Sequence, residues 1–398
     1  MPAITASLRF SKSLIKHIMN IAFVTTDNAK SVLNWSGLNY YISKSLENCG
    51  TRIHYIDDLQ QHFNSVNFLK KVFYTQILHQ KFPLERTIAA AKAYSGSVAK
   101  SLSHNNYDCI FSTGTIPIAY LDAQVPKVFY TDATFACMLN YYPGFHNLSS
   151  DTIMQGHQLE KQALASCALA IYSSDWAARS AIRDYGTDPS KVKVVPFGAN
   201  WDLQYSKEEI SGYINRRGVS KLKILFNGVD WKRKGGDLVL SVAGEIKNRG
   251  IDVEVHIVGI RQLTVTNLPG YVINHGFLDK SIPEQKDKLE NLYKDSHFLF
   301  VPSKSEAFGL VFCEASLFGI PSVSRKTGGI TSAIREGRNG FTLDENAAVN
   351  DYADLICEYF NYHDKYVSLA LSSHTEYLQR LNWQTACETL LGLIKGIK

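Results

Sequence analysis

Phe298-Leu-Phe-Val-Pro-Ser-Lys-Ser-Glu-Ala-Phe-Gly-Leu-Val-Phe-Cys-Glu-Ala-Ser-Leu-Phe-Gly-Ile-Pro321 is the most informative part of this chain. Its first residues form a short apolar run that predicts a buried strand ending at Pro302. A polar loop follows, and an apolar helix is expected from about Phe308. The segment is therefore a strand–loop–helix unit of the kind that builds parallel sheets.

The same alternation of short apolar runs and longer amphipathic stretches extends in both directions from this unit. The expected strands are Asn20–Thr25, Arg52–Ile56, Cys109–Phe111, Val128–Tyr130, Leu169–Ser173, Val192–Val195, Lys223–Phe226, Glu254–Val258, Val272–His275, Phe298–Val301 and Ser322–Val323. The pattern is interrupted once, after Pro196, and then restarts. We therefore predict an α/β fold of two successive open halves, with a ligand bound between them beyond the carboxyl ends of the strands.

Composition limits the classes of protein to which the chain can belong. Its 398 residues suggest two or three domains, and 45% hydrophobic with 20% charged residues is typical of globular proteins. No apolar run approaches the ~18 residues of a membrane span. A net charge of +5 permits an anionic ligand or a membrane surface but is too small to indicate nucleic acid.

The cysteines and the first residues bear on location. Seven cysteines are scattered without CxxC or metal-ligand spacing, which predicts buried free thiols, a reducing compartment and a cytoplasmic protein. Residues 1–18 carry cations without acids. We expect a disordered basic leader there, with a transit-like segment as the alternative.

Two glutamates stand out in the first segment. Glu306 lies in its loop and Glu314 two turns into its helix, so the carboxylates can serve one extended ligand from points roughly 9 Å apart. The free N–H groups of Phe308, Gly309 and Leu310 would form an anion site at the helix N-terminus. The simpler alternative is a capping glutamate followed by a glutamate on the helix face.

The surrounding motifs favour the first alternative. Ser305-Glu-Ala-Phe-Gly-Leu-Val-Phe-Cys-Glu-Ala315, Gly319-Ile-Pro321 and Thr327-Gly-Gly329 resemble the EX7E signature of the retaining nucleotide-sugar glycosyltransferases of family 4, which have the GT-B fold. Phe226 to Gly236 resembles the family's phosphate-binding loop, and Asn274 to Asp279 its base-contacting turn. Tyr172 to Trp176 and Val194 to Asn200 resemble its connection between domains. The resemblance runs from about residue 20 to the C-terminus.

This resemblance implies a fold, an activity and a set of roles. An acceptor-binding Rossmann-like domain would span 19–197, a donor-binding one 198–380, and a helix at 381–398 would return to the first. The donor would be a nucleotide-diphosphate sugar and the acceptor a glycan, a lipid-linked molecule or a small hydroxyl compound. Lys234 would neutralise the diphosphate, Glu314 would bind the ribose, and Glu306 would bind the transferred sugar. Gly276 and Phe277 would face the base, and Gly37 would lie near the diphosphate.

The chain departs from the family pattern at two places. Val229 occupies a slot that usually holds arginine, and we expect Arg233 to supply the second positive charge. A histidine usually follows the strand at 128–130, where this chain has Asp132, which could bind a sugar hydroxyl or orient the acceptor. Trp35, beside Gly37, is interpreted equally well as a sugar-stacking or as a packing side chain.

No cofactor beyond the donor and no metal are expected, because the chain has no Asp-x-Asp motif. The stretch Phe68 to Phe82 mixes cations and aromatic residues at helical spacing. A core-packed helix with a solvated basic face is the favoured interpretation, and a peripheral contact with an anionic membrane is the alternative.

Other functions remain open at this point. A sugar-nucleotide epimerase or an inverting transferase could use the same fold. A non-catalytic nucleotide-sugar-binding or scaffold subunit would agree with the departures at Val229 and Asp132. A nicotinamide dehydrogenase is less favoured, because the full glycine-rich fingerprint is missing.

Overall fold

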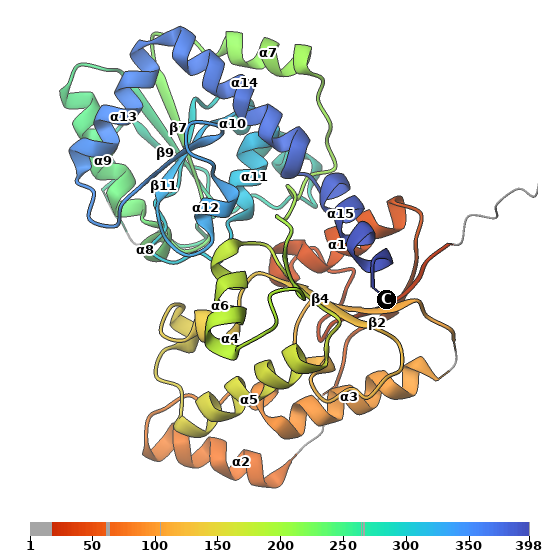
Figure 1. The fold of residues 1–398 in the computed structure, drawn as a ribbon. Helices are drawn as coiled ribbons and strands as arrows, with labels where there is room; N and C mark the ends of the chain where they lie inside the picture. The colour runs from red at the N-terminus through yellow and green to blue at the C-terminus, as the bar shows by residue number, and fades with distance from the viewer. Residues whose placement is uncertain (1–17, 61–63, 104, 264, 266, 398) are drawn as a thin grey trace, which may run out of the picture.

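The computed structural model describes residues 18–60, 64–103, 105–263, 265 and 267–397. The chain forms two open α/β halves placed one above the other (Figure 1). The prediction of two successive α/β halves is therefore confirmed. The leader expected at 1–18 lies outside the described residues except for Ile18, which is exposed.

The N-terminal half contains a six-stranded parallel sheet in the order β2-β1-β3-β4-β5-β6. Its strands are β1 Asn20–Val24, β2 Arg52–Ile56, β3 Cys109–Ser112, β4 Lys127–Thr131, β5 Leu169–Tyr172 and β6 Val192–Val194. Its helices are α1 Leu38–Asn48, α2 Ser65–Val72, α3 Ile88–Leu102, α4 Phe135–Met138, α5 Ser150–Ser166 and α6 Asp175–Tyr185. β1, β3, β4 and β5 are buried along almost their whole length because helices cover both faces of the sheet.

The C-terminal half repeats this architecture with the strand order β12-β11-β10-β7-β8-β9. Its strands are β7 Leu222–Asn227, β8 Val253–Val258, β9 Val272–Asn274, β10 Phe298–Phe300, β11 Ser322–Arg325 and β12 Gly340–Leu343. Its helices are α7 Lys207–Arg216, α8 Trp231–Lys234, α9 Gly236–Asn248, α10 Pro283–Asp295, α11 Leu310–Leu317, α12 Ile330–Ala333, α13 Val349–Asn361 and α14 His363–Arg380. The edge strand β12 was not predicted, since it is short and only partly buried.

The chain crosses between the halves twice, after β6 and again between α14 and α15 (Trp383–Lys395). The crossings touch: Ala199 N–H donates to Leu381 O at 3.0 Å. A Cβ on Gly198 would lie 2.3 Å from the backbone nitrogen of Trp383, so only glycine allows this approach. α15 then packs on α1, on the N-terminal half (Figure 1).

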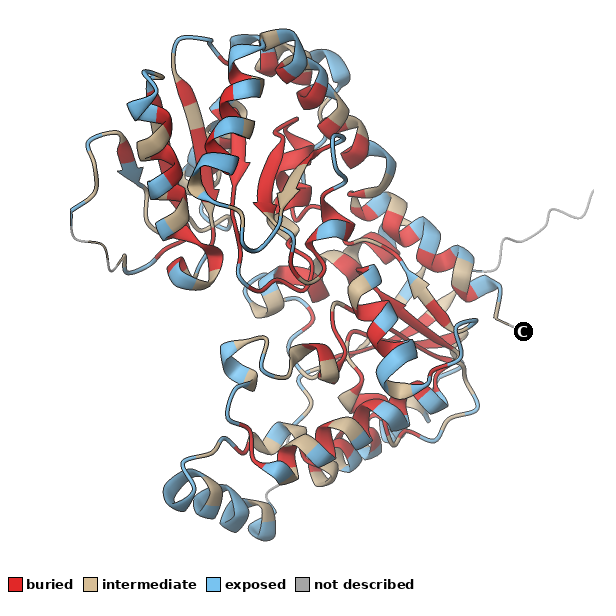
Figure 2. Cartoon of the chain, turned by 60° about the vertical axis from the view of Figure 1, so that its left-hand side comes forward, coloured by how far each residue is buried: buried red, intermediate tan, exposed pale blue. Residues whose placement is uncertain are grey.

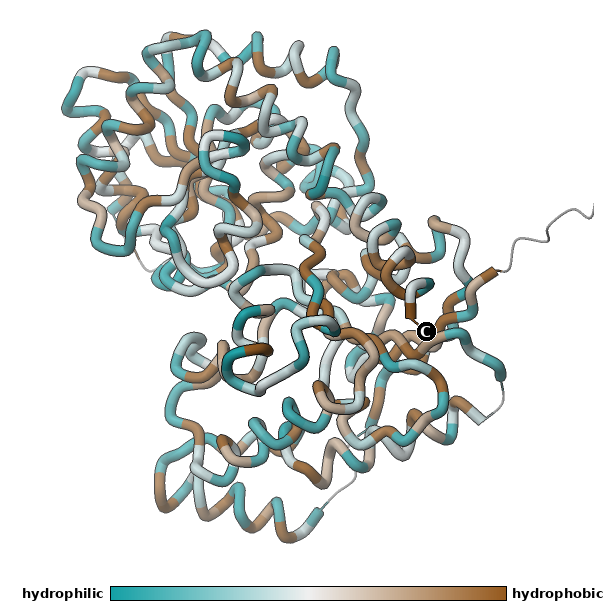
Figure 3. Tube along the Cα trace, viewed as in Figure 1, coloured by the Kyte–Doolittle hydropathy of each residue, from teal (hydrophilic) through white to brown (hydrophobic). Residues whose placement is uncertain are grey.

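The stretch Phe68 to Phe82 differs from its favoured interpretation. α2 continues as a π-helical turn at Phe73–Ile77, and neither segment contains a buried residue. In Figure 2 this helix is mostly exposed, and in Figure 3 apolar and polar residues alternate along it. The prediction of a core-packed helix is therefore wrong, because α2 lies at the surface and none of its apolar side chains is buried.

Candidate functional site

A cavity of about 520 Å³ lies between the halves, and both contribute to its wall. The carboxyl ends of the parallel strands meet there, as expected for open α/β sheets. Its lining includes all the predicted site residues except Gly37 and Gly276: Asp132, Arg233, Lys234, Phe277, Glu306, Phe308, Gly309, Leu310 and Glu314. Gly37 and Gly276 lie next in sequence to lining residues.

The Glu306 carboxylate lies beside two cationic side chains at one edge of this cavity. Lys234 Nζ forms an ion pair with its carboxylate, and Arg233 Nη1 lies 3.7 Å from the same oxygen. Asp230 caps α8 by accepting from Arg233 N at 3.0 Å, which winds both cations into one turn. Gly235 has φ +82° and passes so close to Pro302 that a Cβ would lie 2.3 Å from its oxygen. This packing holds the basic turn against the Glu306 loop.

Close backbone packing explains why the two residues after Thr327 are glycines. Gly329 N–H donates to Glu306 O at 3.0 Å. A Cβ on Gly329 would lie 1.8 Å from Ala307 O, and one on Gly328 would lie 2.1 Å from Glu306 O. The two glycines therefore allow the backbone at 328–329 to pack directly against the backbone at 306–307 and to stabilise the loop that carries Glu306.

Glu314 is held at the other end of the same unit. Its carboxylate accepts from Lys280 Nζ at 2.5 Å and from Tyr293 OH at 3.0 Å. Tyr293 in turn accepts from Asn227 Nδ2 at 2.9 Å. The sequence analysis missed Lys280 and Tyr293. Lys280 could have been found, because it directly follows the turn that ends at Asp279. Tyr293 could not, because in the sequence it is only an aromatic residue of a predicted helix.

The N-terminus of α11 lies between the two glutamates. Gly309 precedes it with φ +94°, and the ring of Phe312 occupies the space that its Cβ would need. Phe312 N–H donates to Gly309 O at 3.0 Å, whereas the earlier N–H groups of a helix have no intrahelical partner, and they carry the positive end of the helix dipole. An anion between Glu306 and Glu314 would therefore meet N–H groups and the Lys234 cation together.

The N-terminal half contributes Asp132, directly after β4, and a strained loop. Burial, with the Glu306 charge adding to it, raises the pKa of Asp132 to about 6, although a hydrogen bond from Trp35 opposes the shift. Trp35 and Ser36 have φ of 45° and 56°, which is uncommon for residues with a side chain. Asn200 stabilises this loop by donating to Ser36 O at 2.7 Å. Trp35 packs edge-on against Phe197 while lining the cavity.

The turn after β9 supplies Phe277, whose ring lies 3.8 Å from the Arg261 guanidinium. Gly276 has φ +67° and donates to Asn274 Oδ1 at 3.0 Å. It shapes the turn that presents Phe277 and does not itself line the cavity.

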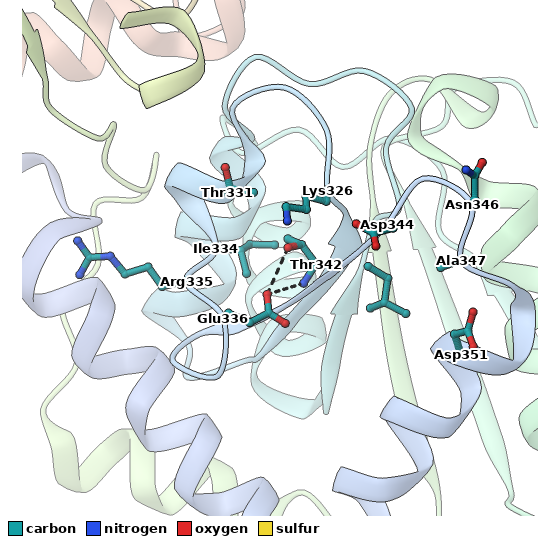
Figure 4. Close-up of a pocket in the computed structure, with 11 residues that line it drawn as sticks. Lys326, Thr331, Ile334, Arg335, Glu336, Thr342, Asp344, Asn346, Ala347 and Asp351 are labelled. Atoms are coloured by element: carbon teal, nitrogen blue, oxygen red, sulfur yellow. Dashed lines mark hydrogen bonds between the residues drawn. The ribbon is translucent and has the colours of Figure 1, made fainter. Parts of the chain in front are cut away.

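A second, open depression of about 890 Å³ lies on the C-terminal half (Figure 4). Its lining residues all fall between Lys326 and Asp351, so the N-terminal half contributes nothing to it. Glu336 there already accepts from Thr342 N and Oγ1 at 3.1 and 3.2 Å. The cavity between the halves, which residues of both halves line, is therefore the stronger candidate for the functional site.

Three further features concern the described part of the chain. No group of three or more His, Cys, Asp or Glu side chains there could hold a metal ion. All seven cysteines are free thiols, and all but Cys49 are buried. No helix in these ranges combines the length and apolar character needed to cross a membrane.

Comparison with known proteins agrees with the motifs. The family model "Glycosyl transferases group 1" matches residues 213–370. A D-inositol 3-phosphate glycosyltransferase of Geodermatophilus obscurus is 29% identical over 213 residues, covering 50% of this chain and 46% of that protein. One of Corynebacterium diphtheriae is 23% identical over 321 residues, covering 75% and 73%. The chain spans about half the length of the first curated relatives it matches.

Solved structures share the whole fold. Sucrose-phosphate synthase of Thermosynechococcus elongatus superposes with a TM-score of 0.68 at 14% identity, covering 95% of this chain and 98% of that one. Anabaena Alr3699/HepE, solved with UDP and glucose, gives 0.60 at 18% identity, covering 95% and 99%. The GT-B fold and the resemblance to family 4 glycosyltransferases are thereby confirmed.

Proposed function

We propose that this chain, whose C-terminal half matches the group 1 glycosyltransferases, moves a hexosyl group from a nucleotide-diphosphate sugar to a hydroxyl acceptor with retention of configuration. One observation carries the proposal. Glu306 and Glu314 face a single cavity, with Lys234, Arg233 and the N-terminus of α11 beside them. No metal and no cofactor other than the donor take part.

The donor binds mainly to the C-terminal half. Breaking the bond to the anomeric carbon leaves negative charge on the departing phosphate, and preorganised donors at such a position are each worth ~10²–10³-fold in rate. Lys234, Arg233 and the N–H groups before α11 are those donors here. Glu314 accepts from a ribose hydroxyl in place of Lys280 or Tyr293, and Phe277 lies beside the base.

The acceptor binds from the N-terminal half. Asp132 faces the same cavity as Glu306 and orients the attacking hydroxyl, while the departing phosphate takes its proton. Asp132 is mostly ionised at neutral pH despite the raised pKa, because that value is only about 6. This arrangement requires no histidine and no dedicated protein base.

The acceptor side also touches an anionic membrane through the surface formed by α2 and the π turn. Apolar side chains are unusually exposed there, at 66% for Leu69 and 65% for Ile77. Lys70 and Lys71 lie on the same helix. Exposed apolar side chains with neighbouring lysines are the combination that an anionic lipid surface attracts. We place the protein in the cytoplasm, partly at the inner face of a membrane, in agreement with its free buried thiols.

A donor panel tests the proposal. The purified protein is incubated with UDP-, GDP- and ADP-sugars, and stabilisation, released nucleotide and product anomer are measured. We expect one donor to stabilise the protein and to be hydrolysed slowly, with hydrolysis lost in Glu306→Gln. Binding without turnover, even with acceptor extracts, would instead indicate a scaffold subunit. An epimerised donor or an inverted product would indicate the other enzymes of this fold.

A further inference from the structure

Two tyrosines of the N-terminal half reach across to the loop that carries Glu306. Tyr141 and Tyr142 follow α4, and their hydroxyls bond to the backbone of the opposite half. Tyr141 OH accepts from Glu306 N–H at 2.9 Å, and Tyr142 OH accepts from Ala307 N–H at 2.6 Å. The hydrogen of Tyr141 points to Glu306 O, at 3.3 Å, or to Thr327 Oγ1, at 3.1 Å.

We propose that Tyr141 and Tyr142 are positioning residues that orient Glu306 only when the two halves are closed. The inference rests on the proposed function and concerns how its site is assembled. The two accepted N–H groups lie on either side of the residue whose carboxylate meets the sugar. When the halves separate, both N–H groups lose these acceptors, and the loop loses two of the bonds that fix its orientation.

The surroundings of the tyrosines support this role. The Tyr141 ring lies 5.0 Å from Trp176, so it is held by its own half. The Arg233 guanidinium lies 5.5 Å from the Tyr142 ring, which links the same contact to a cation beside Glu306. A Cβ on Gly328 would lie 2.3 Å from Tyr141 OH, so the glycine makes room for this hydroxyl.

Contacts other than those of Tyr141 and Tyr142 also hold the two halves together. Asp175 N–H donates to Ser332 Oγ at 3.0 Å as a separate contact between them, and α15 packs on α1. Burial raises the pKa of both phenols, so their hydroxyls stay neutral at physiological pH. Glu314 has neither tyrosine among its partners, so nucleotide binding should not depend on them.

The experiment compares Tyr141→Phe, Tyr142→Phe and the double variant with wild type and Glu306→Gln. Tyr205→Phe is the control, because Tyr205 OH donates to Glu290 Oε1 at 2.6 Å within one half. Turnover and KM are measured with the donor selected by the panel, together with Tm and the Kd of UDP, GDP and ADP. We expect the double variant to lose about 10–100-fold in kcat, because the Glu306 carboxylate is no longer held in one orientation.

KM, nucleotide Kd and Tm should change no more than in Tyr205→Phe. Wild-type kcat in the double variant, with Glu306→Gln inactive, would overturn the positioning role. A parallel loss of Tm and nucleotide affinity would also overturn it, since it would show a merely structural role. If Glu306→Gln itself keeps full activity, the proposed function is wrong. This outcome differs from failure of the positioning role alone, in which Glu306→Gln is inactive and the double tyrosine variant is not.

Discussion

The two halves share one architecture but build their sides of the cavity differently. In the C-terminal half the ionisable residues are buried and paired: Lys234 is 8% exposed, Glu306 9% and Glu314 6%. The N-terminal half offers Asp132, which forms no ion pair with the described residues, a strained loop and an unburied helix, α2. Under the proposed function, a donor diphosphate would need fixed charges, which the C-terminal half supplies through close backbone packing. The N-terminal half is less tightly packed on its side of the cavity, which would suit the binding of an acceptor.

The largest effect should come from removing the cation that the C-terminal half buries. Lys234→Met is expected to lose ~10²–10³-fold in turnover and to lower Tm, because Glu306 keeps a buried charge without its nearest partner. The double variant Lys234→Met/Glu306→Gln should recover Tm but not activity. Lys232→Met is the control, since that side chain is 70% exposed and pairs with Asp237 at the surface. Equal activity of both lysine variants would contradict the assignment.

The next effect concerns packing. Gly329→Ala should cost about 1–3 kcal/mol of unfolding free energy by overpacking the Glu306 loop, because its methyl group would meet Ala307 O. Gly144→Ala, in the N-terminal half, has open space around the new methyl and should be near neutral. Urea unfolding of both variants measures the difference. Two equal midpoints would show that the loops are less tightly packed than described.

A smaller, pH-dependent effect belongs to the N-terminal half. A raised carboxyl pKa means that the folded chain binds the proton more tightly than the unfolded chain. Asp132 therefore favours folding as pH falls from about 6 toward 4, and its ionised form costs stability above 6. Turnover should rise through pH ~6 in wild type. Asp132→Asn should lose this rise and show a higher Tm at pH 8, unlike Asp122→Asn at an exposed site.

Substitutions in α2 and the π turn should have the smallest effect on turnover in solution. Their effect should appear in binding to membranes. Leu69→Ser/Ile77→Ser should leave Tm and soluble turnover unchanged, because neither side chain packs in the core. It should reduce flotation with vesicles rich in phosphatidylserine, and Lys71→Gln should reduce it less. Met154→Ser, another exposed apolar site, is the control. Equal flotation with neutral and anionic vesicles would exclude the charge contribution.

The sequence predicted the sheets well, because strands buried on both faces are continuous apolar runs. The sequence-based prediction missed β12, which is only partly buried. It also predicted core packing for α2, whose apolar residues are not buried. Glu306, Glu314 and Lys234 were predicted as site residues because motifs mark them, and all three line the cavity between the halves. Tyr141, Tyr142, Lys280 and Tyr293 were not, since their roles depend on contacts between segments far apart in the chain. Tyr141 and Glu306, for instance, are 165 positions apart and meet only once both halves have folded.

The packing of α15 on α1 has a consequence for how the protein is made. Cys387, Leu390 and Ile394 are buried in α15, and Cys387 Sγ lies 3.9 Å from Ile42 O in α1. α15 leaves the ribosome after every strand of both sheets. The first half to be synthesised therefore waits with an apolar surface uncovered until the other half is complete. During translation, that surface is available to chaperones and to neighbouring nascent chains.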